Sequence, residues 1–287
     1  MVDTKQFIKK NLEMLLKSGI DSSWFEMKLL LGYLLKKEPK YISFTENLNE
    51  EQRNIFANMI QQRLQHCPVD KIIGEKGFYK YDFIVNEQVL SPRADSEILV
   101  EKAISILKKL PTATILELGV GSGCLILSIL AELKTITGVG IDISQNALDI
   151  AQKNVQKLGI SNDRIKFYKK SWFENDIAEY LTQDAPYDLI ISNPPYIPTK
   201  EIADLDEEVK NYDPLIALEG GEDGLRDYYR ILDIAPQLLK DGGYILFEAG
   251  NAAQLQSIGN LAEKFRFSNL GIIKDLSGNE RCIILKK

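Results

Sequence analysis

The sequence has 287 residues, 45% of them hydrophobic and 26% charged, which suffices for one large domain with a small one, or two of ordinary size. Its formal net charge of −6 and pI near 5.1 argue against an extended basic surface for duplex nucleic acid. No apolar stretch approaches the roughly 20 residues of a membrane-spanning helix, and residues 1–10 lack the apolar block of a secretory signal. We therefore expect a cytoplasmic protein.

Metal and histidine chemistry find little support in the sequence. The cysteines Cys67, Cys124 and Cys282 lie far apart, without the spacing of metal ligands, and His66 is the one histidine. Zinc needs several ligands, and a hydrolase triad needs an oriented base. We predict neither a metal site nor a histidine-dependent triad.

Three helices are expected at the N-terminus, because apolar residues recur there at intervals of three to four. Their ranges are about 7–16, 24–35 and 49–65, with Pro39 and Pro68 following the second and third. Residues 76–90 change to strand formers with a break at Asn86-Glu87, which predicts a β-hairpin. The expected organisation is a helical, substrate-recognising domain over 1–75 and a hairpin linker over 76–92.

Residues 93–287 alternate between strand and helix patterns. After a helix at about 95–109, strands are expected at 114–118, 137–142, 165–169, 187–192 and 243–248, with helices at 123–133, 145–158, 174–182 and 225–239. This alternation predicts a parallel sheet with right-handed crossovers. A helix near 252–264 precedes strands at 269–275 and 281–286. A tight connection at residues 277–279 joins these two strands, so the last should enter antiparallel.

A glycine-rich turn follows the first of these strands. Gly119, Gly121 and Gly123 permit unusual dihedrals and close approach of the backbone to a ligand. Asp142 ends the next strand about 20 residues later, where a carboxylate can accept hydrogen bonds from ribose hydroxyls. The spacing Gly-x-Gly-x-Gly, preceded by the acid Glu117, favours S-adenosylmethionine over NAD. A turn without a ligand, and a capping role for Asp142, are the alternatives.

The strand at 187–192 leads into Asn193-Pro194-Pro195-Tyr196 at the same sheet edge. Two prolines make the segment stiff and remove N–H donors, so the Asn193 side chain and the Pro194 carbonyl form two fixed acceptors for a planar –NH₂ group. Tyr196 offers a flat face to stack on that group and to favour nearby positive charge. Alignment and preset acceptors would assist a poor nucleophile without histidine. We predict methyl transfer to an amide or amino nitrogen; a rigid loop is the alternative.

Together these residues resemble the N5-glutamine methyltransferases of peptide chain release factors, the HemK/PrmC family. The likeness covers nearly the whole chain. It includes residues 68–75, 89–97, 117–123, 140–144, 193–197, 212–214, 217–218 and 220–225. The resemblance implies a Rossmann-like class I methyltransferase fold over residues 93–287, an α/β fold with a seven-stranded sheet and an antiparallel last strand.

The resemblance also implies S-adenosylmethionine as methyl donor and the glutamine of a release factor's Gly-Gly-Gln motif as acceptor. Cofactor contacts would come from Glu117, Gly119, Val120, Gly121, Ser122, Gly123, Asp142, Trp172 and Asn193. The glutamine would be bound by Asn193, Pro194, Pro195 and Tyr196, with Asn193, Pro194 and Tyr196 taking part in catalysis. Release factors are the expected partners, and neither membrane association nor stable nucleic-acid binding is expected.

The sequence departs from the family pattern in one segment and at three single positions. Ala-Asp-Ser-Glu at residues 94–97 stands where Pro-Glu-Thr-Glu is common. Glu117 replaces the usual Asp, and Asp213 replaces the usual Glu. Ser171 stands where an Asp commonly precedes the aromatic residue, here Trp172. The last departure leaves the contact at the adenine edge open. Three alternative functions remain. They are an adenine-N6-type nucleic-acid methyltransferase, a glutamine methyltransferase for a ribosomal protein, and a binding module without activity.

Overall fold

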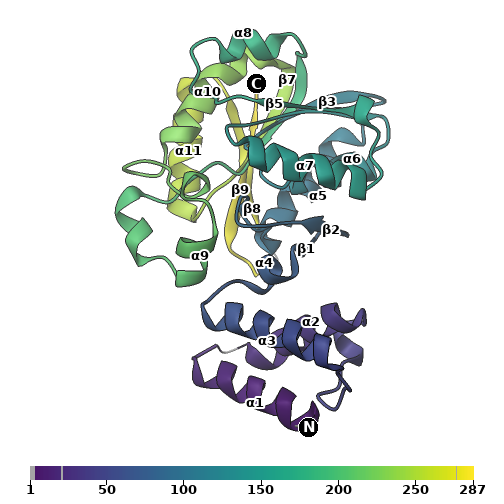
Figure 1. Ribbon diagram of the computed structural model, residues 1–287. Helices are drawn as coiled ribbons and strands as arrows, with labels where there is room; N and C mark the ends of the chain where they lie inside the picture. The colour runs from purple at the N-terminus through teal and green to yellow at the C-terminus, as the bar shows by residue number, and fades with distance from the viewer. Residues whose placement is uncertain (1–3, 21, 276) are drawn as a thin grey trace. The chain divides into compact units, whose positions relative to one another are not determined.

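The computed structural model describes residues 4–20, 22–275 and 277–287 (Figure 1). The chain forms two compact units. One comprises residues up to Glu75 together with Asp206–Tyr212, and the other comprises Lys76–Leu205 and Asp213–Lys287. We call them the helical unit and the catalytic unit. In the described part of the chain, no helix is long and apolar enough to cross a membrane.

The helical unit contains the three expected helices, α1 (Thr4–Lys17), α2 (Ser23–Leu35) and α3 (Glu50–Leu64). Their apolar faces meet in one core, in which Ile8, Leu30 and Phe56 are fully buried. A capping box between Asn49 and Gln52 starts α3. The sequence patterns did not indicate the short helix α4 (Val69–Ile73), which follows Pro68 and ends at Gly74.

Helix α9 (Glu207–Tyr212) belongs to the helical unit although it lies far along the chain. Arg63, whose side chain is 3% exposed, forms ion pairs with Glu26 at 2.6 Å and with Glu208 at 2.5 Å. The Tyr212 hydroxyl donates to the Gln65 carbonyl at 2.8 Å. These contacts stabilise a short acidic helix that has little helix-forming tendency by itself.

The predicted hairpin exists, but its turn was wrongly placed. The strands are β1 (Glu75–Phe78) and β2 (Tyr81–Ile84), so the turn lies at Tyr79-Lys80 and not at Asn86-Glu87. Tyr79 takes the left-handed conformation, with φ of +58°, and its N–H donates to Glu97. Val89 and Leu90 form no strand and instead line a cavity. Strand-forming residues flank this atypical turn, so the sequence pattern did not indicate where the turn lies.

Seven strands of the catalytic unit form one sheet, as expected, in the order β5-β4-β3-β6-β7-β9-β8. The bounds are β3 (Ala113–Leu118), β4 (Ile136–Asp142), β5 (Ile165–Lys169), β6 (Tyr187–Ser192), β7 (Leu239–Glu248), β8 (Ser268–Lys274) and β9 (Glu280–Lys286). The first five strands in this order run parallel, and β9 runs antiparallel to both β7 and β8. The antiparallel last strand is confirmed.

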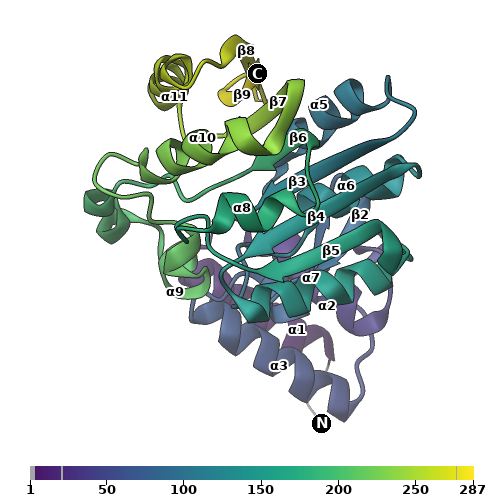
Figure 2. The same cartoon turned by 90° about the horizontal axis from the view of Figure 1, so that it is seen from above.

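Helices cover both faces of this sheet (Figures 1 and 2). Adjacent strand residues point to opposite faces: Ile115 packs with α5 and α6, whereas Leu116 packs with α8, α10 and α11. The central strands β3 and β6 are buried on both faces and mostly apolar, whereas the outer strands β5 and β8 are more exposed and carry polar residues. The helices are α5 (Glu97–Leu107), α6 (Cys124–Glu132), α7 (Gln145–Lys157), α8 (Ile177–Thr182), α10 (Arg226–Leu238) and α11 (Ala252–Lys264).

The order in which strands are added to the sheet switches sides between β3 and β6, which are neighbours. From β3 it proceeds to β4 and β5 on one side, and then crosses to β6 and β7 on the other. Ligands of open α/β sheets bind outside the carboxyl ends of the strands at such a switch point. The glycine loop after β3 and the Asn193–Tyr196 motif after β6 both lie at this edge.

Candidate active site

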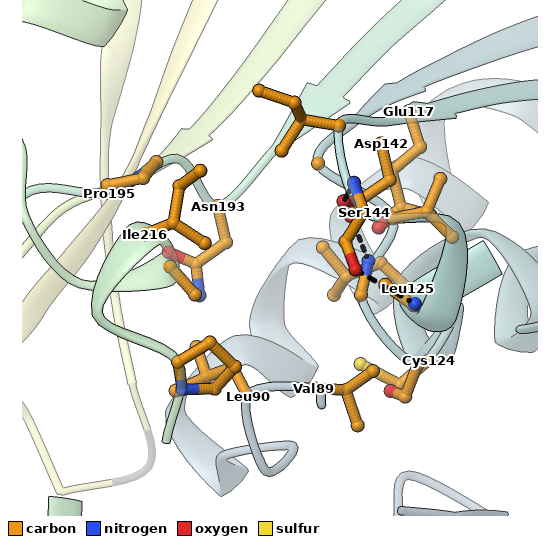
Figure 3. A pocket seen from close by; sticks show the side chains of 18 of the residues that line it. Val89, Leu90, Glu117, Cys124, Leu125, Asp142, Ser144, Asn193, Pro195 and Ile216 are labelled. Atoms are coloured by element: carbon orange, nitrogen blue, oxygen red, sulfur yellow. Dashed lines mark hydrogen bonds between the residues drawn. The ribbon is translucent and has the colours of Figure 1, made fainter. Parts of the chain in front are cut away.

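A cavity of about 450 Å³ opens at the carboxyl ends of the central strands, within the size range of small-molecule sites. The glycine loop and Asp142 border one side, and Asn193 and Pro195 border the other (Figure 3). Ser91–Arg93 and Trp172 complete much of the wall. Among the described residues, no group of three or more His, Cys, Asp or Glu side chains is placed to hold a metal.

The glycine loop takes conformations that require glycine. The φ angles of Gly119, Gly121 and Gly123 are +82°, +54° and +79°, in the left-handed region that most side chains avoid. The Gly119 and Val120 N–H groups both donate to the Ile141 carbonyl, at 2.9 and 3.1 Å. A Cβ added at Gly121 would meet nothing within 4 Å. This part of the loop therefore borders space that a ligand can fill.

Asp142 holds the loop in place. Its carboxylate accepts the Gly121 N–H at 2.9 Å and the Ser144 N–H at 2.9 Å. Burial raises the pKa of this carboxyl group, and the backbone hydrogen bonds oppose that shift. A carboxylate has about four lone-pair sites, so these two bonds and a third from the Ile143 backbone leave acceptor capacity toward the cavity that Asp142 lines.

Glu117 lies at the base of the cavity and is 1% exposed. One carboxyl oxygen accepts the Ile126 N–H at 3.2 Å, in the first turn of α6. Burial raises the pKa of Glu117 well above its usual range, and the charge of Asp142 adds to that effect. The partial positive charge of the helix N-terminus favours a carboxylate here.

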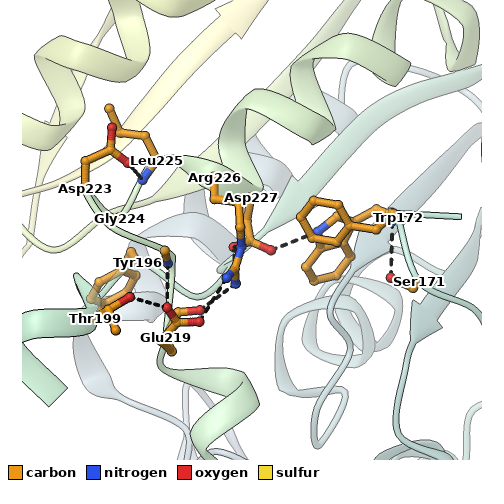
Figure 4. Close-up of polar contacts among 12 residues, drawn as sticks. Ser171, Trp172, Tyr196, Thr199, Glu219, Asp223, Gly224, Leu225, Arg226 and Asp227 are labelled. Carbon is orange, nitrogen blue, oxygen red and sulfur yellow. Dashed lines mark hydrogen bonds and ion pairs between the residues drawn. The ribbon is translucent and has the colours of Figure 1, made fainter.

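Trp172 forms another part of the wall through a partner that the sequence did not reveal. Its Nε1–H donates to Asp227 at 2.9 Å, and Asp227 pairs with Arg226 at 3.0 Å (Figure 4). A Cβ added at Gly119 would lie 3.5 Å from the indole, so the ring borders the glycine loop. The Ser171 hydroxyl oxygen accepts the Phe173 N–H and so belongs to a local turn. Arg226 and Asp227 line the cavity and directly follow the 220–225 pattern, the one signal that could have indicated them.

The four residues of the Asn193–Tyr196 motif are placed differently. Asn193 and Pro195 line the cavity, whereas Pro194 is buried and is not part of its lining. Tyr196 lines a second cavity of about 610 Å³ together with Leu225. Burial raises the Tyr196 pKa to about 12, so the phenol stays protonated at neutral pH.

Glycines of the 220–225 pattern support the motif from behind. A Cβ added at Gly220 would lie 2.5 Å from the Pro195 carbonyl oxygen, and one at Gly224 would lie still closer to the Tyr196 carbonyl oxygen. The Gly220 N–H donates to the Ile197 carbonyl at 2.9 Å. The Gln254 side chain donates to the carbonyl groups of Tyr196 and Gly224, at 3.0 and 2.9 Å. The downstream pattern thus fixes the backbone of the motif.

Two further sequence patterns, at residues 89–97 and 212–214, meet beside the cavity. Asp213 is 8% exposed, accepts the Ser91 N–H at 3.3 Å and pairs with Arg93 at 3.2 Å. Because Ser91 and Arg93 line the cavity, Asp213 holds one of its walls. The shorter Asp side chain, which stands where Glu is common in the resembling family, makes both contacts.

Comparison with known protein families gives two matches that together span most of the chain. Residues 7–74 match the family described as PrmC N-terminal domain, and residues 109–281 match one described as methyltransferase domain. The first match falls in the helical unit, and the second contains the glycine loop and the Asn193–Tyr196 motif.

Several curated proteins are similar over nearly the full chain. A release factor glutamine methyltransferase of Fusobacterium nucleatum is 36% identical, over 97% of this chain and 77% of that protein. One of Geobacter sulfurreducens is 33% identical, over 94% and 91%. A bifunctional methyltransferase of Rickettsia felis is 36% identical over 98% of this chain, which spans 57% of that longer protein.

Solved methyltransferase structures are similar to part of this chain. A SAM-dependent methyltransferase from Agrobacterium tumefaciens aligns with a TM-score of 0.50 at 14% identity, over 74% of this chain and 69% of that one. A release-factor-specific protein-(glutamine-N5) methyltransferase from Alicyclobacillus acidocaldarius aligns at 26% identity with a TM-score of 0.44, over 68% and 93%.

Proposed function

The chain belongs to the release factor glutamine methyltransferase family, and from this premise we propose that it methylates the side-chain nitrogen (N5) of the glutamine in the Gly-Gly-Gln motif of peptide chain release factors. The observation that carries the proposal is the cavity itself, because it joins the glycine loop and Asp142 to Asn193 across one space (Figure 3). The net charge of −6 supports a protein rather than a nucleic acid as partner. We infer a cytoplasmic location from the same proposed substrate.

We propose S-adenosylmethionine as the methyl donor. The open space at Gly121, the free acceptor capacity of Asp142 and the indole beside Gly119 fit the amino-acid, ribose and adenine parts of that molecule. The holding residues would be Glu117, Gly119, Val120, Gly121, Ser122, Gly123, Asp142, Trp172 and Asn193, of which all except Gly123 line the cavity. When bound, S-adenosylmethionine supplies an electrophilic methyl group on a positively charged sulfur.

Asn193 and Pro194 orient the reacting nitrogen in this proposal. The Asn193 side-chain oxygen accepts one N–H of the glutamine amide, and the carbonyl of Pro194, which stands between the lining residues Asn193 and Pro195, accepts the other. Holding both hydrogens directs the lone pair of the nitrogen at the methyl carbon. The acceptors also stabilise the positive charge that builds on nitrogen as the N–C bond forms. As that bond forms, the bond between the sulfur and the methyl carbon would break and the neutral thioether S-adenosylhomocysteine would leave. One of the two N–H protons would pass to solvent, and the product would be the methylated amide.

Tyr196 and Pro195 are proposed to bind the polypeptide that carries the glutamine. Pro195 lines the first cavity and Tyr196 the second, so consecutive residues face two neighbouring spaces. A substrate segment that places its glutamine beside Asn193 can use the Tyr196 ring as an apolar contact for flanking residues. The neutral phenol suits this role better than that of a base.

The test is to locate the methyl group by mass spectrometry. Purified protein, S-adenosylmethionine with an isotopically labelled methyl group and an intact release factor should yield one label on the Gly-Gly-Gln glutamine. The matched control is a release factor in which that glutamine is replaced by glutamate. Ribosomal proteins and duplex DNA tested in parallel address the two alternative substrates. A protein that binds S-adenosylmethionine in calorimetry but labels no release factor would overturn the proposal.

A further inference from the structure

A buried carboxyl group lies next to Asn193 and has no part in the mechanism described so far. Glu248 ends β7, the neighbour of β6, and the register Ser192 to Phe247 makes Asn193 and Glu248 the next pair at the sheet edge. Glu248 is 3% exposed, and its carboxyl group accepts hydrogen bonds from the side chains of Ser96 and Asn193.

The chemistry of this contact determines which way the Asn193 amide points. A carboxylate has acceptors and no donor, so the Asn193 group that faces it must be the –NH₂. The Asn193 oxygen then occupies the other branch of the same planar amide. We propose that Glu248 is a positioning residue, which holds the Asn193 –NH₂ group and so presents the Asn193 oxygen to the substrate nitrogen; this rests on the proposed function.

A restraint of this kind is needed because the two branches of an asparagine amide have nearly the same shape. If the amide were turned over, its –NH₂ would face the –NH₂ of the substrate, donor against donor. A carboxylate partner also polarises the amide, which places more negative charge on the Asn193 oxygen. Both effects favour the positive charge that develops on the substrate nitrogen.

The surroundings of Glu248 place its ionisation near neutral pH. Burial raises its pKa to about 7, while hydrogen bonds from Ser96 and Asn193 and the charge of Arg281 oppose the shift. Its Oε2 accepts no hydrogen bond from the described residues. The titratable groups around it are Asp95, Cys124, Tyr196, Tyr228, Arg281 and Cys282.

The ionised form of Glu248 is the one that orients Asn193 correctly. A protonated carboxyl group can donate its O–H to the Asn193 oxygen and so favour the reversed amide. Because the carboxylate predominates above the pKa, competence should rise as pH increases through about 7.

The first test observes Asn193 directly and needs no substrate. In protein labelled with ¹⁵N-asparagine, the Asn193 side-chain –NH₂ resonances are assigned by their absence from Asn193→Ala. We expect them to shift with a midpoint near pH 7 in the wild type and to lose this transition in Glu248→Gln. Glu132→Gln, which alters a carboxylate bound to Lys80 and Tyr81 outside the cavity, should retain it. Asn193 –NH₂ resonances that are the same in Glu248→Gln as in the wild type across this pH range would overturn the inference.

The second test measures coupling in methyl transfer to a release factor. Glu248→Leu should lower kcat at least about tenfold and leave S-adenosylmethionine affinity within about twofold. In an Asn193→Ala background the same change should have no further effect, because Glu248 acts through Asn193. Additive losses would contradict the inference. If Glu248→Leu does not fold, the pH dependence of kcat/KM is compared between the wild type and Glu248→Gln. The decrease of kcat/KM below about pH 7 that we expect in the wild type should be absent from Glu248→Gln. A wild type that methylates no release factor refutes the proposed function instead, and the resonance test still decides the role of Glu248.

Discussion

Replacing Gly220, which does not itself line the cavity, with alanine should displace the reacting motif from behind. The added Cβ would lie 2.5 Å from the Pro195 carbonyl oxygen and 2.8 Å from the Tyr196 Cα, both backbone atoms. Gly220 does not have a positive φ, so the effect is steric. Ordinary contact begins at 3.4 Å, so the Pro195 carbonyl oxygen must move about 0.9 Å away from the new Cβ. The placement of this motif sets the reaction geometry.

A displacement of about 1 Å can cost on the order of 100-fold in rate, and we expect kcat of Gly220→Ala to fall by about that factor. Overpacking should also cost about 1–3 kcal/mol of stability. S-adenosylmethionine affinity should change little, because the glycine loop after β3 does not contact Gly220. Single-turnover transfer of a labelled methyl group to a release factor measures the rate, and calorimetry measures the affinity.

The matched control is Gly77→Ala in the hairpin, where the new Cβ meets the Asp82 side chain at an ordinary 3.5 Å. That variant should keep wild-type kcat. A folded Gly220→Ala protein that binds S-adenosylmethionine and turns over within about threefold of wild type would refute the reasoning, since backbone displacement on this scale should not be tolerated.

Three further predictions concern the cavity. Asn193→Ala should lower kcat by about 10²–10³-fold, the cost of removing one preset electrostatic partner, while circular dichroism shows an intact fold. Asp142→Ala should weaken S-adenosylmethionine binding in calorimetry by about 1–3 kcal/mol through lost hydrogen bonds; unchanged affinity would exclude the ribose role. The folded-state pKa of Glu248, about 7, exceeds its ordinary 4.5, so its contribution to stability is fully present below pH 4.5 and is lost as pH rises through 7. Over this range the wild type should lose up to about 3 kcal/mol of stability relative to Glu248→Gln. Denaturant titrations at pH 5 and 8 check this, and a constant difference would contradict it.

Much of the catalytic unit was predictable because its strands are apolar runs separated by periodic helices. The antiparallel entry of β9 followed from the short connection after β8. The hairpin turn was not predictable, since Tyr79 and Lys80 are not typical turn residues and Tyr79 is held by Glu97.

Site residues whose role depends on strand order could not be predicted from the sequence patterns. Glu248 is significant because β7 lies beside β6, and an acid at the end of one strand does not reveal its neighbours. Asp227 meets Trp172 from 55 positions away. Helix α9 has no apolar periodicity and owes its stability to Arg63, which is 145 positions from Glu208.

The chain passes between its two units three times, at residues 75–76, 205–206 and 212–213. A single cut after Glu75 therefore leaves the fragments joined by noncovalent contacts, including those of Arg63 with Glu208 and of Gln65 with Tyr212. A recombinant fragment that begins at Lys76 would carry α9 without these partners, a few residues before Pro214 and Ile216 in the cavity wall. Loss of activity in such a fragment would report a disturbed catalytic unit as much as the absence of the helical unit. Substitutions on the surface of α1–α3 are the cleaner way to test the substrate-recognising role that we predict for the helical unit.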